Sequence, residues 1–338
     1  MALRLIEMVL QEKDGEEVRE LLKDQKVLEH RQVRLTDGEV LVRILLDVEQ
    51  NEAVLDLLEN KYAGEDGNRV VILPVEATLP RAEPEPEPEP DAIPGQATPD
   101  EKPPERISRE ELYEDIKDAA RCTRVYLTMS VLSTIVATVG LQHNNVAVII
   151  GAMVIAPLLG PNMALALGTT LGDLPLLRRS VTTVLAGVAA SMAFSVIIGM
   201  LVYVDPALPE VASRTRVGIG DIALALASGS AGAIAFTTGV SAALIGVMVA
   251  VALLPPLVTF GLMIGGGLPV LAMGALSLFM VNLICVNLAG VTTFLVQGIH
   301  PASWWEKERA AKATRIAIGL WVALLAVLVG LIMLLRKG

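Results

Sequence analysis

The first part of the chain alternates apolar and polar residues as a small sheet covered by helices does. Val40–Val48 has an apolar residue at every second position, as in a half-buried strand, whereas Val54 and Leu58 share one face of a helix. The Asp37-Gly38 pair predicts a tight turn between two strands. The predicted elements are strands at 3–10, 27–35, 40–48 and 69–75, and helices at 14–23 and from Asn51, the expected N-cap.

This order of elements, β-α-β-β-α-β, predicts a ferredoxin-like split βαβ domain of the α+β class over residues 1–78. In other proteins such domains assemble into dimers or sense small ligands, an argument by fold-level analogy alone. The segment has no Gly-rich phosphate loop, catalytic constellation or metal-ligand spacing. We therefore expect a role in assembly or regulation.

From about residue 124 onward the pattern changes to long apolar runs. Val125–Gly172 and Ile222–Trp305 contain no Asp, Glu, Lys or Arg. Apolar runs much longer than about 20 residues predict helices that cross a membrane. The predicted spans lie at 124–141, 146–171, 177–204, 217–236, 240–264, 269–298 and 315–335. The expected fold class is a multi-pass α-helical membrane protein with seven spans, preceded by a soluble domain.

An imperfect internal repeat lies within the apolar part. The segment Ile150–Pro161 matches Ile245–Pro256 at an offset of 95 residues, including both terminal prolines. Three predicted spans lie within that offset, and an odd number of crossings makes the second copy enter the membrane from the opposite side. The sequence therefore predicts an inverted 3+3 repeat followed by one further span, an architecture known in transporters.

The distribution of basic residues indicates which side of the membrane the amino terminus occupies. With the amino terminus in the cytoplasm, the inner side carries Arg121, Arg124, Arg178, Arg179, Lys307, Arg309, Lys312 and Arg315, and the outer side carries Arg214, Arg216, Arg336 and Lys337. The positive-inside rule favours this orientation. If the two repeat segments were re-entrant loops instead, Arg178 and Arg179 would fall outside, which argues against that alternative.

A proline- and glutamate-rich linker is predicted over 79–108, between the soluble domain and the membrane domain at 124–338. Its eight acidic and three basic residues together contribute half of the net charge of −10, so this charge does not indicate a particular partner. A basic patch of the kind that binds nucleic acid is absent from the sequence. Ser108 and Glu111 form a capping box that predicts an amphipathic juxtamembrane helix over 109–123.

Cysteine and histidine usage gives no sign of a metal or redox site. Cys122 and Cys285 are far apart in the sequence, and His30, His143 and His300 show no ligand spacing. We expect no cofactor. An intramembrane enzyme would need a nucleophile with a base, or metal ligands, and the spans do not supply such a set.

The repeat places helix-breaking residues at corresponding points of two spans, with Pro157, Gly160 and Pro161 in the second span and Pro255 and Pro256 in the fifth. Proline lacks an N–H and clashes with the preceding turn, so it frees backbone groups. The freed carbonyls suit a cation, and a half-helix N-terminus suits an anion. Asn162 and Thr259, which follow the breaks, add neutral polar groups. Proline kinks that serve packing alone are the alternative interpretation.

Other polar residues in the spans are weaker candidates for a solute or ion pathway. Asp221 is an ionisable residue near a span end, where it is either a helix cap or an ion-coupling group. Ser228 and Ser230 lie in a small-residue cluster that favours close helix packing, or else line a path. Asn282 and Asn287 predict hydrogen bonds between helices, or a place on the pathway.

The segment GAMVIAPLLGP at 151–161, the GTTLGD sequence at 168–173 and the ALLPP sequence at 252–256 carry a family resemblance. They resemble the uncharacterised prokaryotic membrane proteins defined by domain of unknown function 389. The resemblance covers the membrane part most strongly, and many members carry a similar small α/β domain. It implies a multi-pass protein of the prokaryotic inner membrane, and supplies no functional residues.

Two functions from different classes remain open on the sequence alone. The first is a secondary transporter or channel-like permease for a small solute or ion, with a cytoplasmic regulatory or assembly domain. The alternative is a non-transporting membrane sensor or scaffold whose soluble domain binds a cytoplasmic ligand or partner. The expected partners are the lipid bilayer, the solute and further copies of the chain. Since the two breaks have no charged neighbour, a weakly held, small or neutral solute fits better than a tightly bound multivalent one.

Overall fold

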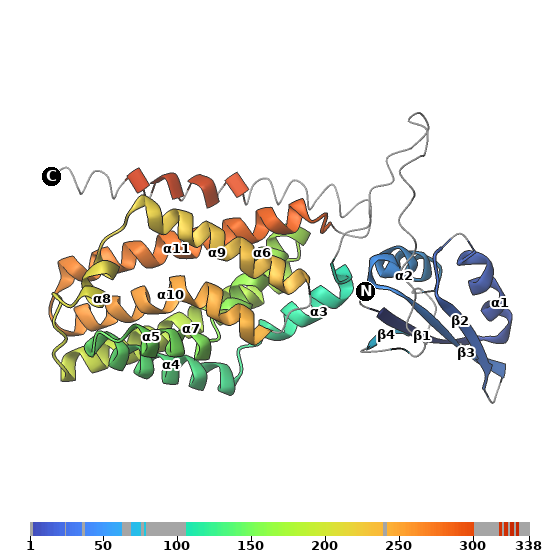
Figure 1. Cartoon of the computed structure of the whole chain (residues 1–338), viewed down its shortest axis with the longest axis horizontal. Coiled ribbons are helices and arrows are strands. Elements are labelled where there is room, and N and C mark those ends of the chain that lie inside the picture. The colour runs from blue at the N-terminus through green and yellow to red at the C-terminus, as the bar shows by residue number, and fades with distance from the viewer. Residues whose placement is uncertain are drawn as a thin grey trace. The chain divides into compact units, whose positions relative to one another are not determined.

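The computed structural model describes residues 3–23, 25–35, 38–62, 69–75, 78, 106–238 and 242–300, together with 318, 319, 321–323, 325–327, 329 and 330. The residues cluster into two compact units, Met1–Glu111 and Leu112–Gly338 (Figure 1). Most of the predicted linker at 79–108 lies outside the described residues. Each unit has a core of its own.

The first unit is a four-stranded antiparallel sheet with two helices. Strands β1 (Leu3–Gln11), β2 (Glu29–Arg34), β3 (Glu39–Asp47) and β4 (Val70–Val75) lie in the order β2-β3-β1-β4. Helices α1 (Glu12–Leu21) and α2 (Val48–Tyr62) alternate with the strands in the order that the sequence predicts. Side chains of alternate strand residues, such as Ile6 and Ile44, form the core with Val18 and Leu58 of the helices.

The predicted N-cap role of Asn51 is wrong. Strand β3 ends at Asp47 and α2 begins directly at Val48, so Asn51 lies inside the first turns of the helix rather than before it. Its side chain is fully buried, and both polar atoms of its amide lack a hydrogen-bond partner among the described residues. The chain passes from strand to helix without a loop, which leaves no room for a cap at this position.

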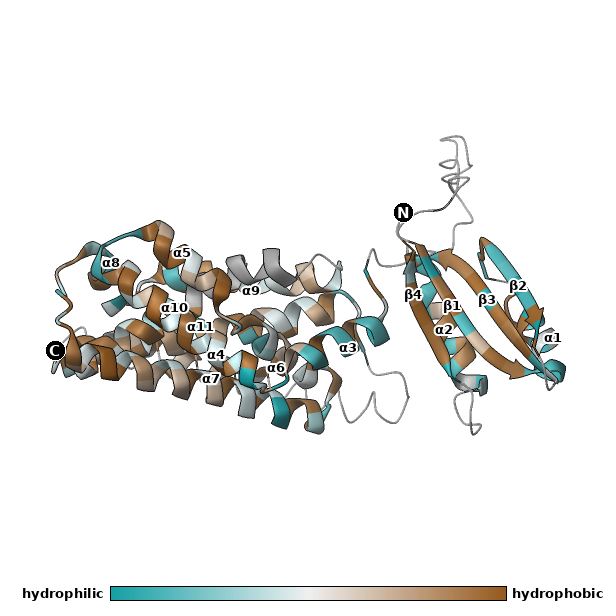
Figure 2. Cartoon of the chain, turned by 90° about the horizontal axis from the view of Figure 1, so that it is seen from below, coloured by the Kyte–Doolittle hydropathy of each residue, from teal (hydrophilic) through white to brown (hydrophobic). Residues whose placement is uncertain are grey.

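The second unit is helical, and its helices after the polar first one are mostly apolar (Figure 2). They begin with α3 (Arg109–Ala119), whose N-terminal residues belong to the first unit, and continue with α4 (Arg124–Gln142), α5 (Val146–Ile155), α6 (Leu159–Leu171), α7 (Leu174–Leu201), α8 (Pro209–Ala212), the 3₁₀ helix η2 (Ser213–Thr215), α9 (Ile219–Thr237), α10 (Ala242–Gly265) and α11 (Pro269–Val296). The Ser108 hydroxyl accepts a hydrogen bond from the Glu111 N–H, as the predicted capping box requires. Thr123, Asn145 and Asp173 cap α4, α5 and α7.

Helices α4, α7, α9 and α11 are long and apolar enough to cross a membrane, and the bent pair α5–α6 adds a fifth span if it is counted as one. This count covers only the part of the chain that the structure describes. The predicted fifth span corresponds to α10, and about half of the seventh, at 315–335, lies outside the described residues. The chain is therefore a multi-pass helical membrane protein, and the number of seven spans stays a prediction.

The helix bounds follow the offset of the sequence repeat. Helix α9 begins and ends 95 residues after α4, and α11 begins and ends 95 residues after α7. Helix α10 occupies the position that corresponds to α5 and α6 together. The two sets of three spans thus have matching lengths.

The two repeat segments differ at the predicted breaks. Helices α5 and α6 meet at an angle of 54°, whereas α10 continues as a helix through Pro255 and Pro256. The expected interruption of the fifth span is therefore wrong. At the offset of 95, the counterpart of Pro157 is Ala252, which does not force the preceding residue out of the helical region.

Glycines allow the helices of the second unit to approach one another at backbone distance. Helix α7 packs against α10, and α9 packs against α11. A Cβ added to Gly199 would lie 2.5 Å from the carbonyl oxygen of Leu262, and one added to Gly229 would lie 2.8 Å from the Cα of Val286. Close backbone approach through small residues is the usual way in which helices associate inside a membrane.

Candidate functional site

The break between α5 and α6 is produced by Pro157. Because a proline disfavours the helical region for the residue before it, Ala156 adopts an extended conformation with a ψ of 119°. The α5 helix consequently ends at Ile155, and α6 begins at Leu159. Pro161 lies in the first turn of α6, where its missing N–H removes no helical hydrogen bond.

Helix α6 lies in the interior of the second unit. From Leu159 to Thr170 every residue except Gly160 is buried. Gly160 packs against the end of α3, since an added Cβ would lie 2.7 Å from the Cβ of Ala119. A helix buried on all sides faces protein rather than lipid, so its polar side chains need partners inside the molecule.

A pair of buried amides joins the beginning of α6 to α11. The Asn287 Nδ2 donates to Asn162 Oδ1 at 3.0 Å and to the Leu283 carbonyl at 2.8 Å, and Asn162 Nδ2 donates to the Leu158 carbonyl at 2.7 Å. Both side chains are almost completely buried, with exposures of 1% for Asn162 and 0% for Asn287. The amide pair therefore links the start of α6 to α11, through two residues that are 125 positions apart in the chain.

Two buried oxygen atoms near these helices remain without a hydrogen-bond partner among the described residues. They are Asn287 Oδ1 on α11 and Thr259 Oγ1 on α10, and both side chains have an exposure of 0%. An unsatisfied buried polar atom costs about 1–3 kcal/mol. A bound water or a polar solute offers the hydrogen bonds that these atoms lack. Such a set can bind a small polar molecule, but it contains no acid, base or nucleophile.

The two proline-containing segments of the repeat contribute to the same buried core. Ala156 and Leu158 at the break belong to one cluster with Leu253, Leu257 and Val258 of α10. Pro255, Pro256 and Thr259 are buried between or beside these α10 residues. The structure thus gathers the residues around both repeat segments in one region of the second unit.

The remaining sequence candidates lie elsewhere or serve packing. The Asp221 carboxylate accepts a hydrogen bond from the Gly218 N–H at 2.8 Å and so caps α9. Ser228 and Ser230 are half-buried and flank Gly229 at the contact between α9 and α11. Asn282 is buried on α11, five residues before Asn287.

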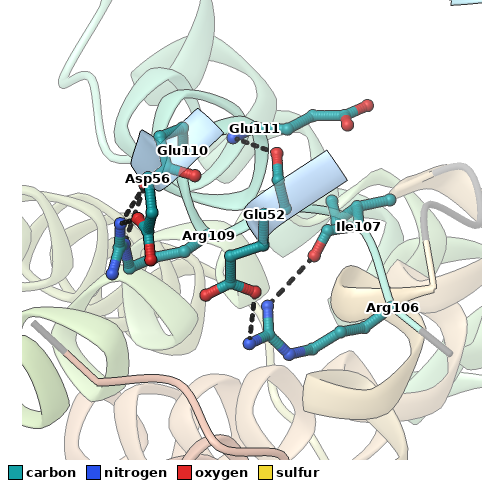
Figure 3. Close-up of polar contacts among 8 residues, drawn as sticks. Glu52, Asp56, Arg106, Ile107, Arg109, Glu110 and Glu111 are labelled. Carbon is teal, nitrogen blue, oxygen red and sulfur yellow. Dashed lines mark hydrogen bonds and ion pairs between the residues drawn. The ribbon is translucent and has the colours of Figure 1, made fainter. Parts of the chain in front are cut away.

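A second polar cluster, which sequence reasoning missed, lies in the first unit. Arg106 pairs with Glu52 at 2.7 Å, Arg109 pairs with Asp56 at 3.1 Å, and both carboxylates come from α2 (Figure 3). The guanidinium of Arg4 donates two hydrogen bonds to Glu111, at 3.0 and 2.9 Å. These contacts hold residues 106–111 against β1 and α2.

The same cluster contains three carboxylates that lie close together. The ligand atoms of Asp56, Glu59 and Glu110 are within 4.8 Å of one another. Arg109, however, donates hydrogen bonds to Asp56 and to Glu110. A guanidinium among the acidic groups supplies the positive charge that a metal ion would bring, so we infer no metal centre here.

Glu52 makes the first unit sensitive to pH. Burial raises the pKa of its carboxyl group above the ordinary 4.5, more than the neighbouring Arg106 and Arg109 lower it. When the folded pKa lies above the unfolded value, stability is greatest below the unfolded pKa and falls as pH rises through the folded one. In the Glu52→Gln variant we expect this part of the pH dependence to vanish. The free energy of unfolding of the wild type, minus that of the variant, should therefore decrease as the pH rises from 4.5.

Hydrogen exchange of the α2 amides in the full chain, corrected for the intrinsic rate at each pH, measures this difference. Glu59→Gln is the matched control, because Glu59 is an exposed acid of the same helix. Parallel pH profiles of wild type and Glu52→Gln would contradict the prediction.

Comparison with known proteins assigns the chain to a family. The uncharacterized protein MJ0678 of Methanocaldococcus jannaschii is 38% identical over 290 residues, which are 86% of this chain and 86% of that protein. A family model described as a domain of unknown function, DUF389, matches residues 153–288. This chain belongs to the DUF389 family. No solved structure matches it significantly.

The part of this DUF389 protein that matches the family model contains the whole candidate site. The match begins near the end of α5, three residues before Ala156, and ends within α11, one residue after Asn287. The break, the amide pair and Thr259 therefore all lie inside the family domain. The arginine cluster of the first unit lies outside it.

Proposed function

We propose that this DUF389 protein is a secondary transporter or channel-like permease for a small solute or ion. The proposal is carried by the broken span at Pro157, whose α6 half is fixed to α11 by a buried amide pair. Backbone breaks inside a membrane mark the binding sites of many transporters, since they leave polar groups for a substrate. The unpartnered oxygens of Asn287 and Thr259 add two acceptors to this region.

The depth of the break supports this proposal. At about 1.5 Å per residue, the ten residues of α5 extend about 15 Å, half of a hydrocarbon core of about 30 Å. A helix that crosses perpendicular to the membrane would thus bring Ala156 near the middle of the bilayer. Substrate sites of transporters with repeats lie at that depth.

We further propose an inverted 3+3 repeat and a cytoplasmic amino terminus. The equal offsets of α4 and α9 and of α7 and α11 support the repeat. The hydrogen bond from the Glu210 N–H to Asn144 Oδ1 joins two connections that the proposed topology assigns to the same side. The excess of basic residues on the other side favours the cytoplasm there, as expected for a prokaryotic cell membrane.

The chemistry of the region favours a small, neutral, hydrogen-bonding solute. Its side chains are amides and a hydroxyl, and the Asp221 carboxylate is occupied in capping the N-terminus of α9. The first unit, which we interpret as a ferredoxin-like domain, would act in regulation or assembly. We propose no catalytic step for the protein.

Flux into proteoliposomes tests the transport proposal. The full chain is reconstituted, and the entry of urea, glycerol, K⁺ and Cl⁻ is compared with that into empty liposomes. The proposal expects protein-dependent entry of at least one of these probes, with the neutral ones favoured. A folded protein that carries none of them would contradict it, and would favour the alternative of a membrane sensor or scaffold.

A further inference from the structure

One face of the sheet in the first unit is mostly apolar and carries none of the helices that the structure describes. Since strand side chains alternate, Ile6 and Met8 point to the helices, whereas Leu5, Glu7 and Val9 point to the opposite side, which we call the open face. The sheet is seen as a broad surface in Figure 2, with apolar residues along β3 and β4. Val9, Val33 and Leu73 on this face are 38%, 48% and 40% exposed.

The strand register arranges the open face in three rows. Leu5 lies between Leu45 and Leu73 in one apolar row, and Val9 and Val33 flank Leu41 in another. An apolar face of this kind on a soluble domain marks an interaction surface.

Charged residues separate the two apolar rows. On the edge strand β2, Arg31 lies beside Arg43 and pairs with Glu29 of the same strand. A second ion pair lies at the centre of the face. The Arg43 Nε lies 2.7 Å from Glu7 Oε1, and the two side chains are 49% and 23% exposed. An exposed ion pair contributes only about 0–1 kcal/mol to stability. The Arg43–Glu7 pair therefore contributes little to the stability of the fold. Its central position on the face instead determines which partner binds there and in which orientation.

The central pair of Arg43 and Glu7 is complementary to itself, whereas Arg31 at the edge of the row lies opposite β4 of the second copy. A two-fold axis parallel to the strands, between β1 and β3, stacks two copies with β1 of one opposite β3 of the other. Arg43 then faces Glu7 of the second copy, and the same contact recurs by symmetry. Leu5 faces Leu45 of the second copy, and Val9 faces Leu41. Stacked sheets lie about 10 Å apart with their strands nearly aligned, a separation that Arg and Glu side chains bridge.

We propose that the open face is a homodimer interface, on which the first units of two chains stack sheet to sheet. Strands about 4.8 Å apart with about 3.4 Å per residue give a four-stranded, six-residue face of about 400 Å². Two such faces bury less than the roughly 1,200 Å² of a stable interface. The contact therefore needs two chains held in one membrane, where tethering raises their effective concentration.

A charge exchange between two differently tagged full-length chains tests this interface. One chain carries Arg43→Glu with Leu41→Cys, and the other carries Glu7→Arg with Val9→Cys, both in a Cys122→Ser background because Cys122 is exposed. A bis-maleimide with a short spacer reports the contact of position 41 with position 9 in proteoliposomes. Each charge variant breaks the ion pair within its own chain, so only a contact between chains can be restored by mixing.

We expect a different cross-linking yield for each of three combinations of charges. With the native charges, the chains carrying Leu41→Cys and Val9→Cys cross-link. With Arg43→Glu in both chains, like charges face one another and the yield falls about tenfold. With Arg43→Glu in one chain and Glu7→Arg in the other, opposite charges meet again and the yield recovers.

Arg34→Glu in both chains is the matched control. It makes the same charge change in the same sheet, but its partner Glu12 belongs to α1. The cross-link is expected to remain at the native level. A cross-link that is absent with native charges, insensitive to Arg43→Glu, or not recovered in the mixture overturns the proposal. Binding of the open face to lipid also overturns the proposal. It would be seen if added anionic lipid abolished the cross-link equally in all charge variants.

Discussion

Replacement of Asn287 by leucine is expected to reduce solute flux strongly and to destabilise the second unit. The variant removes the donor to Asn162 Oδ1, which then stays buried without its partner on α11. Leaving such an acceptor unsatisfied costs about 1–3 kcal/mol. It also removes the free Oδ1 of Asn287, one of the two acceptors that we assign to the solute. Flux of the transported probe should fall about tenfold or more, since 1.4 kcal/mol corresponds to a factor of ten.

A double variant separates the two effects. In Asn162→Leu with Asn287→Leu both members of the pair become apolar, and the loss of stability is expected to shrink, because no side chain is left unpaired. Flux should remain lost, because the polar groups at the break are gone. Thr292→Val on the same helix is the control, as this hydroxyl is exposed and bonds its own helix. Wild-type flux in the double variant would show that the amides serve packing only.

Addition of a single methyl group at Gly229 is expected to separate α9 from α11. The Cβ of Gly229→Ala would lie 2.8 Å from the Cα and 2.9 Å from the carbonyl oxygen of Val286. These are backbone atoms, so no side-chain rotation relieves the overlap, and one helix must move. Overpacking costs about 1–3 kcal/mol, and rigid surroundings place this site at the upper end. Thermal unfolding in detergent and the yield of monodisperse protein measure the effect.

Gly220→Ala on the same helix provides the comparison. An added Cβ at this position meets nothing within 4 Å. Since alanine favours helices more than glycine does, the control variant is expected to be as stable as wild type or slightly more stable. Equal unfolding temperatures for Gly229→Ala and Gly220→Ala would contradict the close approach of α9 and α11.

Local signals predict most of the helices and strands. The alternation at 40–48 corresponds to β3, and the Ser108–Glu111 capping box corresponds to the start of α3. Asp173, which caps α7, was not recognised as a cap, although Asp before an apolar helix with proline in its first turn is a start signal. Such signals depend on neighbours in the sequence and therefore appear without a structure.

The sequence predicts the effect of the prolines less well. Pro161 and Pro256 correspond in the repeat but have different positions in their helices. Pro161 follows a break that Pro157 makes four residues earlier, whereas its repeat counterpart Pro256 has Ala252 at that position. Only the first segment is broken. The prolines that the repeat shares therefore do not break a span by themselves, and the break depends on Pro157, which has no counterpart in the second segment.

Contacts between distant segments were beyond prediction from one sequence. Asn162 and Asn287 were each singled out as polar residues in apolar spans, but nothing in the pattern pairs them across 125 residues. The arginines at 4, 106 and 109 were overlooked because their carboxylate partners lie on separate elements. The sequence does contain one signal for this cluster, because Arg106 and Arg109 lie on either side of the capping residue Ser108.

The burial of α6 has a consequence for the biogenesis of the protein. Ribosomes release α6 into the membrane more than 100 residues before the end of α11 is synthesised. During that interval Asn162 has no amide partner, and the helix that will be enclosed by protein has to tolerate lipid or a temporary host. The second unit is therefore completed late, after insertion of its last described long helix. A chain that terminates before Asn287 would present quality-control proteases with an unfinished core rather than a smaller working protein.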